Sequence, residues 1–240
     1  MTRLSVNINK IATIRNARGG NVPDVTLAAQ RCEEFGAQGI TVHPRPDERH
    51  IRYADVREIR PLIRTEFNIE GNPTVASFVD LVMEVVPDQV TLVPDGHNAI
   101  TSNAGWDTLQ NKALLTDLCQ TFRSKGIRTS IFIDPDPRMA YGAAACGADR
   151  VELYTADYAE QYSHGPEAAI ARYVEAAKAA KDAGLGLNAG HDLSLENLAW
   201  FIRTIPWTDE VSIGHALISD ALYMGLEKTI QAYLGEIRKK

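Results

Sequence analysis

The feature that most constrains the fold is an alternation, repeated eight times, between two kinds of segment. A short run rich in β-branched residues comes first, and a segment with apolar residues spaced by three and four follows it. Strands that alternate with helices form a parallel sheet with right-handed crossovers. Eight such units in 240 residues match the size of one (β/α)₈ TIM barrel, about 250 residues. The expected strands are Leu4–Asn9, Gly39–His43, Phe67–Glu70, Gln89–Val93, Thr129–Asp134, Arg150–Tyr154, Leu185–Asn188 and Glu210–Ile213.

An open, doubly wound sheet is the competing architecture, and it predicts a glycine-rich turn after the first strand. Here that strand runs into Lys10–Arg15, without a GxGxxG motif. No linker rich in Pro, Gly or Ser divides the chain, so residues 1–240 are expected to form one domain. Residues 95–107 and 156–165 exceed a plain repeat and predict loops or extra short helices.

The boundaries of several helices can also be predicted. Helical spacing is clearest in Val25–Phe35, Val75–Val86, Leu114–Phe122 and Ile170–Ala177. Expected helix starts are Asp24, Thr74 and Ser194, because side-chain oxygens at these positions can cap a first turn. Glycines are expected to end helices at Gly36, Gly126, Gly147 and Gly184.

Composition excludes several classes of protein. The net charge is −6, and the only basic run is Arg238–Lys240, which argues against a nucleic-acid partner. No apolar stretch approaches the roughly 20 residues that a membrane helix needs, and no apolar signal region follows Met1. The cysteines Cys32, Cys119 and Cys146 form no CxxC motif. They are expected to be buried free thiols in a reducing cytoplasm.

Polar side chains gather where the expected strands end, which is where such barrels hold their active sites. Alternation along a strand puts Asn7 with Asn9, Thr41 with His43, and Asn68 with Glu70 on common faces. A single histidine at a strand end is usually a surface residue, and His97 and His164 are read in that way. Glu152, inside an apolar strand, must pair with a cation or do chemistry, because an unpaired buried carboxylate is costly. The joint placement of His43, Glu70, Glu152 and His191 favours an active site.

Metal binding is the alternative to acid–base chemistry. His43, His191, His215 and Glu70 could converge on a metal, but there is no HxH, HExxH or cysteine cluster. Lys10, Arg18 and Arg45 are expected at the same rim, where cations repel a metal and suit anionic substrate groups. Arg15–Gly20 adds a basic, glycine-ended loop. Gly190 and Gly214 stand after the seventh and eighth strands, where barrels often bind phosphate.

These residues together resemble the pyridoxine 5′-phosphate synthase family of vitamin B6 biosynthesis. The resemblance runs from Val6 to about Gly225. Arg45 and Arg49–Ile51 accompany seven motifs, which occur in the right order. The motifs are Val6–Ile8 with Ile11–Gly19, Gly39–His43, Asn68–Glu70, Leu92–Pro94, Ser130–Asp134, Leu187–His191 and Ile213–Ala216.

The resemblance implies a barrel with extra helices, usually an octamer, and the proton transfers of its reaction call for no metal or redox cofactor. It implies condensation of 1-deoxy-D-xylulose 5-phosphate with 3-amino-2-oxopropyl phosphate. By position, His43 and Glu70 match general bases, His191 a general acid and Glu152 a transition-state stabiliser. The positions that hold the amino ketone phosphate are matched by Asn7, Arg18, Asp192, Gly214 and His215, and those that hold the xylulose phosphate by Arg45, His50 and Thr101.

Two positions depart from the family's common form. Asn9 and Lys10 replace an Asp-His pair, so a carboxylate is lost and a fixed cation replaces an imidazole. Both are expected to face substrate. Asp192 stands where glycine is frequent, and it would repel a phosphate placed close to its side chain.

Two other functions stay open at this stage. A different phosphate-binding barrel enzyme, an aldolase or an epimerase, is the first. A class I aldolase needs a Schiff-base lysine, for which Lys10 is the candidate. A non-enzymatic barrel that binds a phosphorylated ligand is the second.

Overall fold

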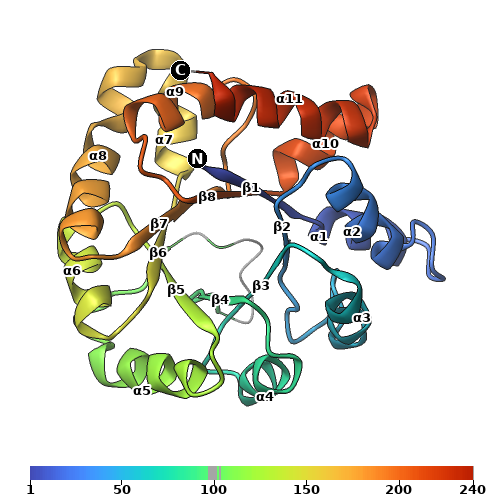
Figure 1. Cartoon of the computed structure of the whole chain (residues 1–240), viewed down its shortest axis with the longest axis horizontal. Helices are drawn as coiled ribbons and strands as arrows, with labels where there is room; N and C mark the ends of the chain where they lie inside the picture. The colour runs from blue at the N-terminus through green and yellow to red at the C-terminus, as the bar shows by residue number, and fades with distance from the viewer. Residues whose placement is uncertain (97–101, 103, 240) are drawn as a thin grey trace.

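The computed structural model describes residues 1–96, 102 and 104–239, and its strands form a closed parallel barrel in chain order (Figure 1). The predicted (β/α)₈ fold is therefore confirmed, with small shifts at the strand ends. The strands are β1 Arg3–Asn7, β2 Gly39–Val42, β3 Glu66–Gly71, β4 Gln89–Leu92, β5 Arg128–Ile133, β6 Arg150–Leu153, β7 Gly186–Ala189 and β8 Glu210–Ile213.

Helices surround the barrel on its outside (Figure 1). They are α1 Asn9–Asn16, α2 Val25–Glu34, α3 Tyr53–Ile59, α4 Ala76–Val85, α5 Lys112–Arg123, α6 Pro137–Ala145, α7 Ala156–Gln161, α8 Pro166–Asp182, α9 Leu198–Thr204, α10 His215–Met224 and α11 Leu226–Arg238. Two short 3-10 helices, η1 Arg60–Leu62 and η2 Tyr162–His164, complete them. The extra helical segment expected in 156–165 is thus present as α7 and η2.

Most of the predicted helix boundaries are confirmed. Asp24 caps α2 by accepting hydrogen bonds from the N–H groups of Thr26 and Leu27, and the four predicted glycine stops all have positive φ. Two predicted starts are wrong. The Asn72 side chain turns the chain at Thr74, so α4 begins at Ala76. A turn closed by a hydrogen bond from Ser194 N–H to the Asn197 side chain delays α9 to Leu198.

The inside of the barrel is polar throughout its middle. Each strand contributes one buried polar residue to that level: Ser5, Thr41, Asn68, Thr91, Ser130, Glu152, Asn188 and Ser212. Their alternate neighbours, such as Leu4, Ile40 and Val90, belong to the apolar core between the sheet and the helices. The barrel thus departs from the usual interior filled with bulky branched residues.

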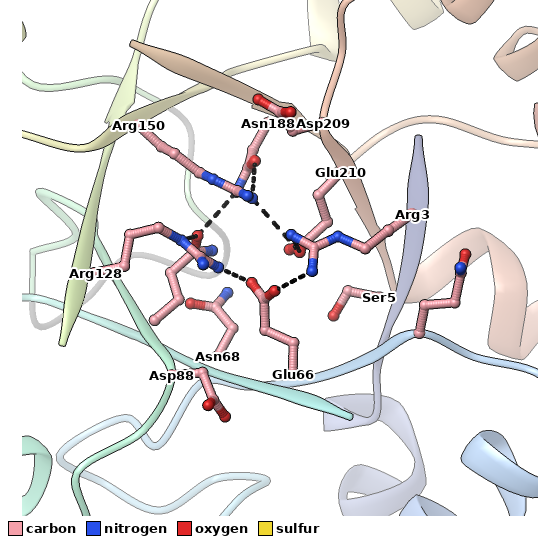
Figure 2. Close-up of polar contacts among 12 residues, drawn as sticks. Arg3, Ser5, Glu66, Asn68, Asp88, Arg128, Arg150, Asn188, Asp209 and Glu210 are labelled. Carbon is pink, nitrogen blue, oxygen red and sulfur yellow. Dashed lines mark hydrogen bonds and ion pairs between the residues drawn. The ribbon is translucent and has the colours of Figure 1, made fainter. Parts of the chain in front are cut away.

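Charged side chains close the end of the barrel where the strands begin (Figure 2). Glu66 of β3 bridges Arg3, at 2.6 Å, and Arg128. Arg150 donates to Asn188 Oδ1 at 2.9 Å and lies 3.8 Å from Glu210 Oε2. We call Arg3, Glu66, Arg128, Arg150 and Glu210 the base network. Burial lowers the pKa of Arg128 to about 10 and raises that of Glu210, so the network stabilises charges that are costly to bury.

A side chain just before each even-numbered strand caps the start of the preceding strand. Asp88, Asp149 and Asp209 accept hydrogen bonds at 2.8 to 2.9 Å from the N–H groups of Phe67, Thr129 and Leu187. Gln38 accepts one from Leu4 N–H, at 3.4 Å. These N–H groups would otherwise lack a partner at the edge of the ladder. Each odd-numbered strand is therefore capped by a residue that lies just before the next, even-numbered strand.

The described residues include no helix that is long and apolar enough to cross a membrane. Cys32, Cys119 and Cys146 are buried free thiols, as predicted. Burial raises the pKa of Cys32 and Cys119 to about 12, so these thiols are not nucleophiles at neutral pH.

Candidate active site

A cavity of about 860 Å³ opens at the carboxyl ends of the strands. The structure brings nearly all of the predicted site residues to its wall. They are Asn7, Asn9, Lys10, His43, Arg45, His50, Glu70, Glu152, His191, Asp192, Gly214 and His215. Arg18 is exposed beyond the end of α1 and does not line the cavity. Thr101 and His97 lie outside the described residues.

The turn from β1 into α1 is shorter than the sequence suggested. β1 ends at Asn7 and α1 begins at Asn9, so these two residues do not share a strand face, which corrects the prediction. Instead Asn7 Oδ1 accepts the N–H of Asn9 at 3.0 Å. Asn9 Oδ1 in turn accepts the N–H of His43 at 2.9 Å. The two amides thereby fix the position of His43, and Lys10 is left exposed at the rim.

His43 and Glu70 form the centre of the cavity. His43 Nδ1 lies 3.9 Å from Glu70 Oε2, and Asn7 Nδ2 donates to the same oxygen at 3.4 Å. Burial raises the pKa of Glu70 to about 7. Burial, together with the charge of Arg45, lowers the pKa of His43 well below its usual value. Near neutral pH His43 is therefore a neutral base, and Glu70 can both take up and release a proton.

Asp95, just after β4, is a site residue that the sequence analysis missed. Its Oδ2 lies 2.7 Å from Arg45 Nη2 and 3.9 Å from His43 Nε2, and it accepts a hydrogen bond from Ser102 Oγ at 2.7 Å. Asp95 lies three residues beyond Leu92, the last residue of β4, as Asp192 lies three residues beyond Ala189, the last residue of β7. The sequence places Asp95 at the start of the expected insertion, residues 95–107, and does not indicate its contact with Arg45.

Glu152 is buried in the middle of β6. A carboxylate in this position is expected to pair with a cation or to take part in chemistry. No described residue forms a hydrogen bond with its Oε2. Burial, and the nearby Glu70 and Glu210, raise the pKa of Glu152 well above its usual value. Protonation of this carboxyl avoids the cost of a buried charge, and the protonated form has an O–H that can donate into the cavity.

His191 and Asp192 follow β7 and interact directly, with His191 Nδ1 at 3.0 Å from Asp192 Oδ2. Burial alone would lower the pKa of His191, but the hydrogen bond and charge of Asp192 raise it. Gly190 precedes them. A Cβ there would lie 2.0 Å from the Ser212 carbonyl oxygen, so this glycine is needed for close contact with β8 rather than for the approach of a ligand.

The basic residues divide between the site and the scaffold. Arg15 was expected in a loop at the rim, but it is buried in α1 and forms an ion pair with Asp55 at 2.6 Å, which corrects that expectation. His50 Nδ1 accepts the N–H of Ile51 at 2.9 Å. Its proton is therefore on Nε2 when the ring is neutral. Burial and the charges of Arg45 and Lys10 lower the pKa of His50 to about 4.

Gly214 joins β8 to α10, which begins at His215 beside the cavity. The first intrahelical hydrogen bond there is donated by Ile218 N–H to the Gly214 carbonyl. The N–H groups of the preceding turn therefore lie at the positive end of a helix, which attracts phosphate. Among residues 1–96, 102 and 104–239, no group of three or more His, Cys, Asp or Glu side chains is arranged to hold a metal ion.

Comparisons with known proteins identify relatives of the chain. Residues 4–239 match the family described as "Pyridoxal phosphate biosynthesis protein PdxJ". The chain is 64% identical to pyridoxine 5′-phosphate synthase of Bacteroides thetaiotaomicron, covering 99% of this chain and 100% of that protein. It is 63% identical to the same enzyme of Cytophaga hutchinsonii, covering 100% of both chains.

Solved structures of other enzymes share the fold alone. The tryptophan synthase α-subunit of Pyrococcus furiosus, as an E244A mutant, is 13% identical, with a TM-score of 0.65 over 97% of this chain and 98% of that one. Phosphoribosylanthranilate isomerase of Thermotoga maritima is 14% identical, with a TM-score of 0.59 over 99% of each chain.

Proposed function

The chain belongs to the pyridoxine 5′-phosphate synthase family, and we propose that its cavity closes the pyridine ring by acid–base catalysis. The substrates are 1-deoxy-D-xylulose 5-phosphate and 3-amino-2-oxopropyl phosphate, and the products are pyridoxine 5′-phosphate, inorganic phosphate and water. One observation carries the proposal: four proton-carrying side chains line one cavity, and their pKa values are moved in different directions. Environments that separate pKa values in this way assign acids and bases.

The reaction moves protons at each stage, through imine formation, loss of phosphate, enolisation and dehydration. His43 is neutral and acts as a base at the first condensation. Glu70, with a pKa of about 7, takes up and returns protons during enolisation. His191 stays protonated to higher pH and gives its proton to a leaving oxygen. Glu152 stays neutral and donates a hydrogen bond to developing negative charge.

The two phosphate groups bind at opposite sides of these residues. The start of α10, with Gly214, His215 and the Asn7 amide, takes the amino ketone phosphate. Arg45, His50 and Thr101 take the xylulose phosphate, with Lys10 as a further cation at the rim. Arg18 reaches the amino ketone phosphate only if its exposed loop closes over the cavity. Asn9 acts by holding His43.

The aldolase alternative is less well supported. A Schiff-base lysine needs a dry, inward position that lowers its pKa. Lys10 is exposed in the first turn of α1, and none of the eight strands contains a lysine. An epimerase would need only two of the four proton-carrying groups.

We further propose that residues 1–240 act as one domain and assemble into a homo-oligomer, an octamer by family resemblance, without nucleic acid. Leu222, Tyr223 and Met224 are consecutive at the end of α10 and are 69%, 92% and 40% exposed, and a contiguous exposed apolar patch favours a protein partner. The three free thiols favour the cytoplasm. Light scattering of the purified protein tests the assembly.

Mixing both phosphorylated substrates with pure protein tests the activity. We expect the ultraviolet absorbance of the pyridinol product to appear, together with one equivalent of inorganic phosphate. The control is the double variant His43→Ala, Glu70→Gln, which retains the phosphate-binding residues. Equal product with the double variant would contradict the roles proposed here. Substrate binding without product in the wild type would favour a non-enzymatic barrel.

A further inference from the structure

Two consecutive residues, His191 and Asp192, form a pair in which both side chains point to one another. The distance from His191 Nδ1 to Asp192 Oδ2 is 3.0 Å, within hydrogen-bond range. The two side chains are 34% and 28% exposed, so the contact lies at the edge of the cavity, partly shielded from water. The ring of Tyr154 packs edge-on against His191, with centroids 6.1 Å apart.

The backbone of Asp192 is committed to neighbouring residues. Its N–H donates to Thr155 Oγ1 at 3.2 Å, and the same hydroxyl donates to the Gly190 carbonyl at 3.1 Å. Its carbonyl accepts from Asn197 Nδ2 at 3.4 Å. The position is therefore held from both sides, and neither backbone group is directed to a substrate phosphate.

We propose that Asp192 is a positioning residue, which accepts the Nδ1–H of His191 and so makes Nε2 the nitrogen that exchanges a proton with substrate. This role builds on the proposed function, because it specifies how the general acid of that reaction is oriented and kept charged. A carboxylate on one ring nitrogen fixes both the tautomer and the ring orientation. It differs from the family resemblance, which places this position against a phosphate.

Other charges around His191 act on it as well. Glu70 of β3 and Asp95 after β4 favour the imidazolium, while His191 itself opposes protonation of His43. Glu152, another carboxyl of the same cavity, is not among the main causes of the His191 shift in pKa. The Asp192 hydrogen bond and charge outweigh Glu70 and Asp95 in raising the pKa of His191. Removing the Asp192 carboxylate should therefore lower the pKa of His191 more than removing any other carboxylate near this ring.

The first test does not depend on activity. Hydrogen–deuterium exchange at Cε1 of His191, followed by mass spectrometry across a pH series, gives the pKa of this single histidine in an assembly of any size. We expect the pKa to fall in Asp192→Asn. Glu160→Gln is the matched control, because it removes a carboxylate from the same cavity wall that is not among the main causes of the His191 shift in pKa, and it should leave the pKa unchanged. An unchanged pKa in Asp192→Asn would overturn the proposal.

The second test measures kinetics against pH. An acid that must be protonated loses activity as pH rises through its pKa, so the alkaline limb of kcat should move to lower pH in Asp192→Asn. An amide is also a weaker acceptor than a carboxylate and can present its N–H₂ to the ring instead, so His191 is held less firmly and kcat should fall about ten-fold even on the plateau. KM should change little. A changed KM with an unmoved limb would instead show contact with substrate and overturn the positioning role.

The two tests separate the possible failures. If the protein makes no product, the exchange experiment still decides whether Asp192 controls His191. If product forms and the pKa of His191 does not move, the proposed function stands and the positioning role fails. Circular dichroism of Asp192→Asn excludes loss of the fold as the cause of lower activity.

Discussion

The two ends of the barrel contain the same kinds of side chain and treat them differently. At the strand starts, Glu66 is held by two arginines, and the base network is closed on itself (Figure 2). At the carboxyl end, Glu70 lies on the same strand and the same face as Glu66, and among the described residues only the Asn7 amide lies within hydrogen-bond distance of its Oε2. Burial raises the pKa of Glu70. The negative charge of Glu66 is instead compensated by the positive charges of Arg3 and Arg128. Pairing, rather than residue type, separates a structural carboxylate from a reactive one.

Removing the reactive carboxylate gives the largest expected effect. Glu70→Gln keeps the size and the burial of the side chain but cannot exchange a proton. Turnover should fall by roughly 10² to 10⁴, the usual size of a general-base effect, while the midpoint of thermal unfolding is kept. Steady-state rates with both substrates measure this. Near wild-type turnover would remove Glu70 from the mechanism.

Neutralising the paired carboxylate, Glu66, should lower the stability of the protein and leave its activity unchanged. Glu66→Gln leaves Arg3 and Arg128 facing one another without the bridging charge, and we expect a loss of about 3 kcal/mol in the free energy of unfolding. Activity per folded molecule should be unchanged. Urea denaturation is the measurement. Glu84→Gln, which breaks an ion pair with Arg57 exposed at the surface, is the control and should change stability little.

Substitution of Lys10 shows whether this residue at the cavity rim binds substrate or takes part in the chemistry. An exposed ammonium can hold a substrate oxyanion as a point charge. Lys10→Ala should raise KM for one substrate by roughly ten-fold with kcat nearly kept, and Lys10→Arg should retain activity. Mass spectrometry after borohydride treatment should find no adduct. A trapped adduct at Lys10, or an inactive Lys10→Arg with normal affinity, would indicate covalent or proton-transfer chemistry.

The raised pKa of Glu152 should make the stability of the protein depend on pH. In the unfolded chain this carboxyl ionises near its ordinary pKa, but in the fold it stays protonated to much higher pH. Rising pH therefore stabilises the unfolded state, and the protein loses stability from above about pH 4.3. Glu152→Gln should remove this loss, raising Tm at pH 8 by a few degrees, on the order seen for such changes, while lowering turnover. Equal pH dependence of Tm in both proteins would count against a buried neutral carboxyl.

Chelation should have the smallest effect. The described residues contain no cluster suited to a metal, and cations line the rim. We expect turnover to survive dialysis against a strong chelator. Loss of activity that zinc or magnesium restores would show that a metal takes part.

Sequence periodicity was enough to predict the barrel, because alternating segments permit few other parallel arrangements. It also placed His43, Glu70, Glu152 and His191 at one cavity, since strand ends meet at one rim. Periodicity did not predict the position of Arg15, because an arginine in a helix can be buried when an acidic partner, here Asp55, is available in the core. Asp95 was missed because only the folded loop reveals its contact with Arg45. The protonation of Glu152 depends on burial from all sides, which no local pattern records.

The caps that join odd strands to even ones make the two-strand unit the natural module of this chain. Within each unit, the cap and the N–H group that it serves are separated by one βα segment, as Asp88 is from Phe67. A circularly permuted chain that opens before β3, β5 or β7 keeps every cap within one continuous module. An opening before β4, β6 or β8 sends a strand and its cap to opposite termini, so that the cap becomes a contact between the two ends of the chain. We therefore expect this barrel to tolerate new termini better before β3, β5 or β7 than before β4, β6 or β8.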